Sequence, residues 1–215
     1  MIYEYDKDTI KIRKRKLDEN ETFIRYYEAL SIVQKVRNLS SRYLSETVSS
    51  QKPFGLRTYV RPQKEGDLIL VSSGGTGPYH RGEVSSGLDW IDKWKLMTSI
   101  RTQEHAGQAD KDGMKRILSR TEILPPLWIC TESYIVIDVQ ETEERIQNVF
   151  SYIKTRFVRF LMSLVTSSQA INKMSFALVP LQDFSKPWTD QELYKKYNLT
   201  TDEIAFIESM IKPME

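Results

Sequence analysis

The longest run of patterned apolar residues spans 128–165 and predicts a strand followed by a helix. Residues 129–137 are rich in β-branched and aromatic side chains, which pack well on a pleated surface. Between residues 146 and 164, apolar side chains recur three or four positions apart and therefore share one helical face. Thr142 is the expected N-cap. We expect strand 129–137 and a long amphipathic helix, 142–165, to form the scaffold.

Shorter patterns predict the other elements. They are an edge strand around 10–12 with a basic flank, a helix from Asn20 to Leu39, strands at 68–71 and 93–100, a glycine-rich turn at 72–78, a polar loop at 104–120, and two short helices after the capping boxes at Thr189 and Thr200. Together these elements predict an α+β fold, in which a mixed sheet is backed by the long helix and followed by a short helical C-terminal tail. The expected boundaries are 1–180 and 181–215.

Composition narrows the class of protein only slightly. The 215 residues include 31 basic and 29 acidic side chains, so the net charge of +2 does not by itself indicate a nucleic-acid partner. The single cysteine, Cys130, permits no intramolecular disulfide and is expected to be a buried apolar residue in a reducing, cytoplasmic compartment. No apolar run approaches the ~20 residues of a membrane span, so we expect no membrane partner.

Several catalytic motifs are missing from the sequence. The glycines at 74–77 are not followed by the Gly-Lys-Ser/Thr of a phosphate-binding loop, so a plain turn is favoured over a loop that approaches a DNA phosphate. His80, His105 and Cys130 lack metal-ligand spacing. The only Pro-Pro pair, in 124–127, lacks the polar and aromatic neighbours of the loop with which adenine methyltransferases hold a flipped base.

Arginine and lysine residues are interleaved with aromatic residues in the predicted loops. Arginine can bind guanine edges, and both residues can neutralise phosphates, so this distribution favours DNA contact. The full set is Arg57, Tyr59, Arg61, Lys64, Tyr79, Arg81, Arg101, Lys111, Lys115, Arg116 and Arg120. From it we predict DNA contacts at Arg57, Arg61, Lys64, Arg81, Lys111, Lys115 and Arg116.

Four stretches carry a resemblance to a known family. They are residues 52–58 (KPFGLRT), 129–137 (ICTESYIVI), 152–161 (YIKTRFVRFL) and 179–190 (VPLQDFSKPWTD) with the tail that follows. Together they resemble the C-terminal part of Eco57I-like, adenine-specific DNA methyltransferases of bacterial restriction–modification systems. The resemblance covers about residues 20 to 215, and its closing stretch is the most specific part.

The resemblance implies a function without catalysis. In that family the N-terminal half carries the S-adenosylmethionine site and the Pro-Pro loop, and the C-terminal half recognises the target. We therefore expect a target-recognition domain that binds double-stranded DNA, has no cofactor of its own, and works with a methyltransferase catalytic domain or subunit. Two alternatives stay open: a metal-dependent nuclease using carboxylates such as Asp67, Glu83 or Glu132, and a protein-interaction module that docks a partner through residues 188–210.

Overall fold

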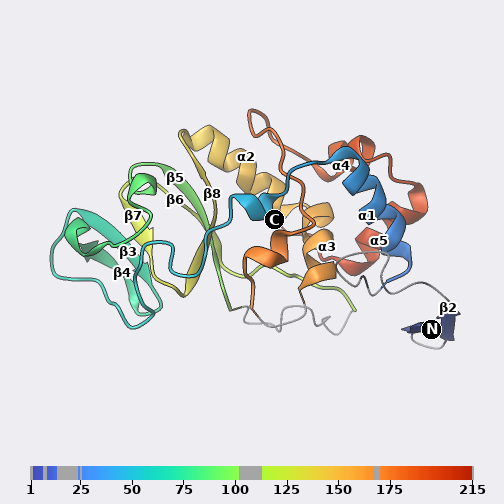
Figure 1. The fold of residues 1–215 in the computed structure, drawn as a ribbon, viewed down its shortest axis with the longest axis horizontal. Helices are drawn as coiled ribbons and strands as arrows, with labels where there is room; N and C mark the ends of the chain where they lie inside the picture. The colour runs from blue at the N-terminus through green and yellow to red at the C-terminus, as the bar shows by residue number, and fades with distance from the viewer. Residues whose placement is uncertain are drawn as a thin grey trace.

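The computed structural model describes residues 2–6, 9–13, 24, 26–101, 113–166 and 170–214, the first two ranges by their backbone alone. Figure 1 shows the two three-stranded sheets toward one end of the molecule and the helices toward the other, which confirms the α+β class. The helices are α1 (Glu28–Leu39), α2 (Glu143–Lys154), α3 (Arg156–Val165), α4 (Asp190–Lys196) and α5 (Thr201–Met210). The strands are β1 (Ile2–Asp6), β2 (Thr9–Arg13), β3 (Leu68–Ser72), β4 (Gly75–Tyr79), β5 (Trp94–Ser99), β6 (Thr121–Leu124), β7 (Trp128–Cys130) and β8 (Tyr134–Gln140).

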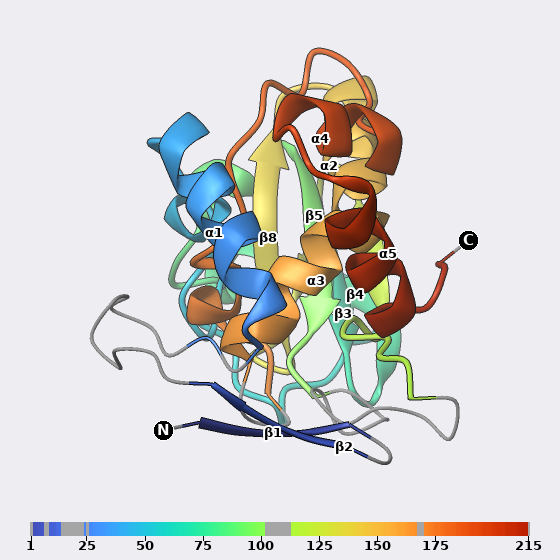
Figure 2. The same cartoon turned by 90° about the vertical axis from the view of Figure 1, so that its right-hand side faces the viewer.

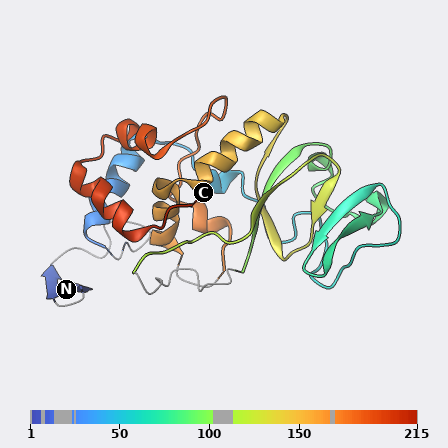
Figure 3. The same cartoon turned by 180° about the vertical axis from the view of Figure 1, so that it is seen from behind.

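Three layers follow one another along the molecule. The outer sheet has the strand order β4-β3-β7 and is mixed, because β3 pairs antiparallel with β4 and parallel with β7. The central sheet has the order β6-β5-β8 and is antiparallel. Helices α1 to α5 form the helical layer beyond the central sheet, as Figures 2 and 3 show from two further sides. Strands β1 and β2 form a separate antiparallel hairpin.

Strand β8 is buried on both faces because it lies between two cores. Ile135 and Ile137 pack with the helices, whereas Tyr134 and Val136 pack with the outer sheet. Successive side chains of a strand point to opposite faces, so the continuous apolar run supplies both cores at once. The central sheet is therefore the shared wall between the helical layer and the outer sheet.

The predicted strand 129–137 is wrong in one respect, because it is two strands in different sheets. Strand β7 ends at Cys130 and β8 begins at Tyr134. The backbone N–H of Tyr134 donates to the carbonyl of Thr131 at 3.1 Å, which closes a turn, and the N–H of Glu132 donates to the carbonyl of Leu56 at 2.9 Å. The polar interruption within the apolar run is thus where the chain crosses from the outer to the central sheet.

The predicted single helix 142–165 is also divided, at Thr155. Thr142 caps α2 as predicted, with its side chain accepting from the N–H of Arg145. Thr155 has extended backbone angles (φ −60°, ψ 148°), and its hydroxyl accepts from the N–H of Val158 to cap α3. The carboxylate of Asp190 then accepts from the first two N–H groups of α3, at 3.1 and 2.9 Å. Helix α2 packs on β5 and β8, so the helix backs the antiparallel sheet and not the mixed one.

Most of the shorter predictions are confirmed. Strands β3 and β5 and the edge strand β2 form where the pattern predicted them, and the glycine-rich turn is a hairpin whose second strand, β4, already begins at Gly75. Both capping boxes are present, at Thr189 before α4 and at Thr200 before α5. Helix α1 begins only at Glu28, so the predicted start at Asn20 is wrong: Ile24 and Tyr26 are described and not helical, while Asn20 itself lies outside the described residues. Strands β1, β4 and β6 were not predicted.

The C-terminal helices belong to the helical core. Phe157 of α3 stacks on Tyr197, with ring centroids 5.1 Å apart, and Phe160 meets Phe206 of α5 edge to face at 5.8 Å. Such aromatic contacts add to the burial of apolar area that holds α4 and α5 against α3. The predicted helical tail is therefore present, and its apolar side chains pack into the helical core. The domain boundary between residues 180 and 181 stays a prediction.

Candidate nucleic-acid interface

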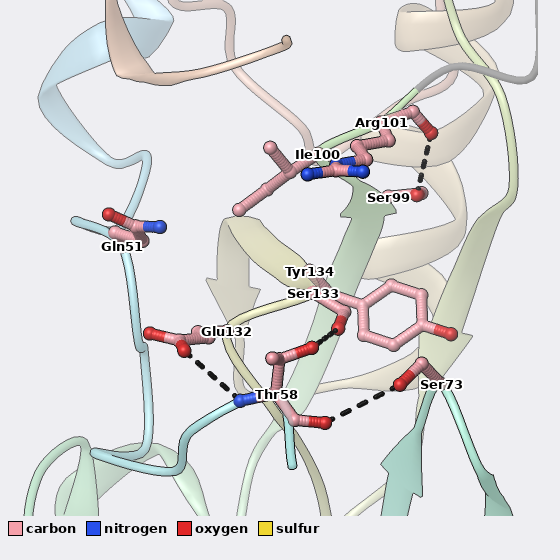
Figure 4. Close-up of a pocket in the computed structure, with 9 residues that line it drawn as sticks. All are labelled: Gln51, Thr58, Ser73, Ser99, Ile100, Arg101, Glu132, Ser133 and Tyr134. Carbon is pink, nitrogen blue, oxygen red and sulfur yellow. Dashed lines mark hydrogen bonds between the residues drawn. The ribbon is translucent and has the colours of Figure 1, made fainter.

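An open cleft with a volume of about 550 Å³ lies where the edges of the outer and central sheets meet. Four segments supply its walls: the loop before β3, the β3–β4 turn, the end of β5 and the β7–β8 turn. Figure 4 shows these side chains around the opening. The lining residues are Gln51, Thr58, Ser73, Ser99, Ile100, Arg101, Glu132, Ser133 and Tyr134. Most of the lining side chains thus carry a polar group, and the position of the cleft follows from the crossing between the two sheets.

Hydrogen bonds tie the separate walls of the cleft together. The hydroxyls of Thr58 and Ser133 are 2.8 Å apart, and the hydroxyl of Ser73 donates to the carbonyl of Thr58 at 3.4 Å. The backbone N–H of Thr58 donates to the Glu132 carboxylate at 3.1 Å. Because these bonds join the loop, the hairpin and the β7–β8 turn, the polar groups are held in place before any ligand arrives.

The charges of the cleft leave a net positive surface. Glu132, whose side chain is only 12% exposed, lies 3.8 Å from both the Lys52 ammonium and the Arg57 guanidinium. Arg101 is exposed, and its guanidinium forms no hydrogen bond or ion pair with any described residue. In Figure 4 its side chain extends over the opening. Behind the opposite wall, Arg120 donates to the hydroxyl of Tyr134 at 3.0 Å.

Arg61 lies across the tip of the β3–β4 hairpin. Its guanidinium donates to the carbonyls of Thr58 and Val60, at 2.7 and 3.0 Å, and a Cβ added to Gly74 would come within 2.3 Å of its Nε. The absence of a side chain at Gly74 therefore makes room for the arginine. The glycine-rich turn is a plain hairpin turn, as favoured from the sequence, and it positions a cation beside the cleft.

Tyr59 is 74% exposed, more than any other large hydrophobic residue in the described part of the chain. It follows Thr58 of the cleft wall and lies two residues before Arg61. Aromatic rings that remain in solvent beside cations are suited to stacking on nucleic-acid bases. The loop 57–61 therefore presents two arginines and one aromatic ring next to the opening.

The structure groups some of the predicted contact residues and separates others. Arg57 and Arg61 lie at the cleft, and Lys64 is exposed further along the same loop. Arg81 forms a bidentate ion pair with Asp92, at 2.7 and 3.1 Å, and a second ion pair with Asp67 at 3.6 Å. Its charge is neutralised within the chain, and its hydrogen bonds hold the pKa of Asp92 below the usual range.

The remaining predicted contacts lie away from the cleft or outside the described residues. Lys115 is buried, and its ammonium donates to the hydroxyl of Tyr26 at 3.3 Å and lies over that ring. Arg116 is exposed, and its carbonyl accepts from Arg159 in the helical layer. Lys111 falls in the segment 102–112, which is not among the described residues. The structure therefore does not bring Lys115 or Arg116 to the arginines of the cleft.

The carboxylates named for the nuclease alternative are each engaged within the chain. Asp67 accepts from the backbone N–H of Arg81, Glu83 accepts from Gln63 and Tyr79, and Glu132 accepts from Thr58. Among the described residues no group of three or more histidine, cysteine, aspartate and glutamate side chains is arranged to hold a metal ion. Cys130 is fully buried, as expected, and burial raises the pKa of its thiol to about 12.

The comparisons with known proteins return nothing that adds to this geometry. No known protein family, no curated protein and no solved structure matches the chain. Within the described ranges, no helix is long and apolar enough to cross a membrane.

The choice of site residues from the sequence missed much of the cleft. Arg101 and Tyr59 were in the wider set of basic and aromatic residues but were not selected. The lining hydroxyls of Thr58, Ser73, Ser99 and Ser133 gave no signal, because serine and threonine are common throughout the chain. The one usable hint was the glycine-rich hairpin, for which approach to DNA had been the less favoured alternative.

Proposed function

We propose that the chain binds double-stranded DNA as the target-recognition part of an adenine-specific (N6) DNA methyltransferase of a restriction–modification system, without the catalytic half. The observation that carries the proposal is the exposed group Arg57, Tyr59 and Arg61 at the mouth of a cationic cleft. Cations at a groove edge neutralise phosphates, and the hydroxyl of an adjacent exposed tyrosine can donate to a phosphate oxygen. The assignment to a methyltransferase system rests on the resemblance of the sequence to Eco57I-like methyltransferases.

The partner in this proposal is a methyltransferase catalytic domain or subunit. S-adenosylmethionine would bind to that partner, and no residue of this chain is assigned to it. The outer sheet and its hairpin would hold the duplex while the partner acts on adenine. The central sheet would hold the helical layer and the outer sheet in a fixed relation, since β8 packs into both cores.

A binding experiment with matched charge changes tests the proposal. The affinity of the chain for labelled duplex is measured as a function of salt concentration for the wild type, for Arg57→Gln with Arg61→Gln, and for Arg42→Gln with Lys173→Gln. The control pair removes two exposed charges from the helical layer. We expect the first pair to lower the salt slope by about two, because each lost phosphate contact changes it by about one. We expect the control pair to leave the slope unchanged.

The result also separates the alternatives. Selection from a pool of randomised duplexes is expected to return one preferred sequence. An unchanged salt slope in the Arg57/Arg61 pair would contradict the proposed interface. Absence of duplex binding at low salt would contradict the function itself and favour a protein-interaction module. Cleavage of the duplex that requires added Mg²⁺ would favour the nuclease.

A further inference from the structure

We propose that the cleft binds one nucleotide unit, a base together with its phosphate. This inference rests on the proposed function for its source, a nucleotide that has left the base stack of a bound duplex. A free mononucleotide offers the same chemistry, so the two sources are separated by experiment. Three properties of the cleft carry the inference: its neutral polar lining, its charge and its shape.

The neutral lining suits the edge of a base and the oxygens of a sugar. Hydroxyls from Thr58, Ser73, Ser99 and Ser133 come from different segments and meet at one opening. Ser73 and Ser99 already donate to backbone carbonyls, and one of Thr58 and Ser133 donates to the other. The wall therefore offers acceptor oxygens and one remaining O–H donor to a base edge. The amide of Gln51 adds one donor group and one acceptor on the facing side.

The charge of the cleft matches a single phosphodiester. The carboxylate of Glu132 accepts from the N–H of Thr58 and lies 3.8 Å from the Lys52 ammonium, which balances its charge. The Arg57 guanidinium is at the same distance from this carboxylate but is 56% exposed, so it can also contact a phosphate from the 57–61 loop. Arg101 then remains as the cation over the opening, with no partner among the described residues. A guanidinium can grip two phosphate oxygens at once through its planar fork. One cation with its donors turned to the cleft is the complement of one phosphate.

The shape of the cleft excludes a base that is still stacked. Its volume of about 550 Å³ lies within the range of small-molecule sites, and Tyr134 and Ile100 supply apolar surface for the face of a base. A base inside a duplex exposes only its groove edges, so a concave site with several walls can surround it only after it leaves the stack. The cleft should therefore prefer an extrahelical nucleotide to a paired one.

The test compares a fully paired duplex with the same duplex carrying one bulged nucleotide. We expect the wild type to bind the bulged duplex about tenfold more tightly, the effect of one good base or phosphate contact. The variant Arg101→Gln with Ser133→Ala should lose this preference while still binding the paired duplex through the 57–61 loop. Arg101→Lys, which keeps the charge but not the planar guanidinium, should retain part of the preference for the bulged duplex. Arg42→Gln, a matched arginine of the helical layer, should retain all of it.

A second arm uses deoxyadenosine monophosphate alone. Saturable binding that Arg101→Gln with Ser133→Ala removes would support the cleft as a nucleotide site even if no duplex binds, and would then identify a free nucleotide as the source. Duplex binding without any bulge preference, together with no mononucleotide binding, would overturn the inference and leave the proposed function standing. A bulge preference that survives in the Arg101/Ser133 variant would overturn it as well. Folding of each variant is checked by its thermal unfolding.

Discussion

The α2–α3 junction and the cleft use the same kinds of side chain for opposite purposes. At the junction Arg159 is 1% exposed, and its Nε donates to the carbonyls of Lys154 and Thr155 at 3.1 and 3.3 Å. At the cleft Arg101 is exposed, and its guanidinium makes no hydrogen bond or ion pair with a described residue. The first arginine completes the end of a helix, and the second leaves its donors for a ligand.

The difference shows why an arginine in a sequence cannot be assigned by type alone. Burial lowers the pKa of Arg159 to about 10, so its charge carries a desolvation cost that the neighbouring carbonyls and the Asp190 carboxylate offset in part. One of its nitrogens, Nη2, is buried without a hydrogen-bond partner. The cleft cations carry no such cost because water still reaches them. Mutations at the junction should therefore change stability, and mutations at the cleft should change binding.

The largest effect is expected from Arg159→Ala. The change leaves a cavity and removes the donor from two buried carbonyls, so the free energy of unfolding should fall by about 3 kcal/mol. Urea denaturation measures it, with Arg42→Ala as an exposed control. DNA affinity of the folded variant should stay at the wild-type value, and a selective loss of affinity without loss of stability would break the comparison.

A pH-dependent effect is expected at Lys95, a fully buried lysine of β5. Its ammonium donates to the carbonyls of Trp90, Ile91 and Lys93, and burial lowers its pKa from 10.5 to about 8. Between these values the unfolded chain holds the proton that the folded chain has released. Stability from this group therefore rises with pH across that window, by about 3 kcal/mol at most.

The measurement is the difference in unfolding free energy between the protein with Lys95 and its Lys95→Met variant from pH 7 to pH 10. Both proteins carry Cys130→Ala, because the raised pKa of that thiol lowers stability at high pH and its charge interacts with that of Lys95. The unfolding free energy of the protein with Lys95 should increase relative to that of Lys95→Met as the pH rises. A difference that stays constant would mean that the folded-state pKa of Lys95 is not lowered.

A smaller loss of stability is expected from Asp190→Ala. Its carboxylate accepts from the N–H groups of Arg156 and Phe157 and so caps α3 from the start of α4. Loss of a helix cap costs about 1 to 2 kcal/mol. Chemical denaturation should show this for Asp190→Ala and almost nothing for Asp202→Ala, an exposed aspartate in the first turn of α5. Equal effects from the two variants would contradict the capping role.

The smallest effect on stability, with a clear effect on binding, is expected from Gly74→Ala. The new methyl group would meet the flexible side chain of Arg61 and displace it from the hairpin tip. The unfolding free energy should change by less than about 0.5 kcal/mol, because only a surface side chain moves. Duplex affinity should fall as it does in Arg61→Gln. Gly82→Ala, which has open space around it, is the control.

Local patterns in the sequence were sufficient where local interactions decide the structure. The caps at Thr142, Thr189 and Thr200 bind backbone groups three residues away, and all three were predicted. The breaks at Thr131 and Thr155 were not predicted, because distant groups help to fix them. The carbonyl of Leu56 binds the β7–β8 turn, and Asp190 caps α3.

The site was less predictable than the fold for the same reason. Arg57 and Arg61 could be chosen because they flank an aromatic residue in a loop. Arg81 also follows an aromatic residue, Tyr79, and Lys115 lies in a run of basic residues, yet Asp92 pairs with the first and Tyr26 covers the second. The polar walls of the cleft come from segments up to about 80 residues apart in the chain, and no spacing rule joins them.

The position of bound DNA is the most direct test of the account. Backbone amide chemical shifts are recorded while a short duplex is added to the protein. We expect changes concentrated at 51–61, 73–74, 99–101 and 132–134, with α4 and α5 nearly unaffected. Changes concentrated on α4 and α5, or spread evenly over exposed lysines and arginines, would contradict the cleft as the nucleic-acid interface.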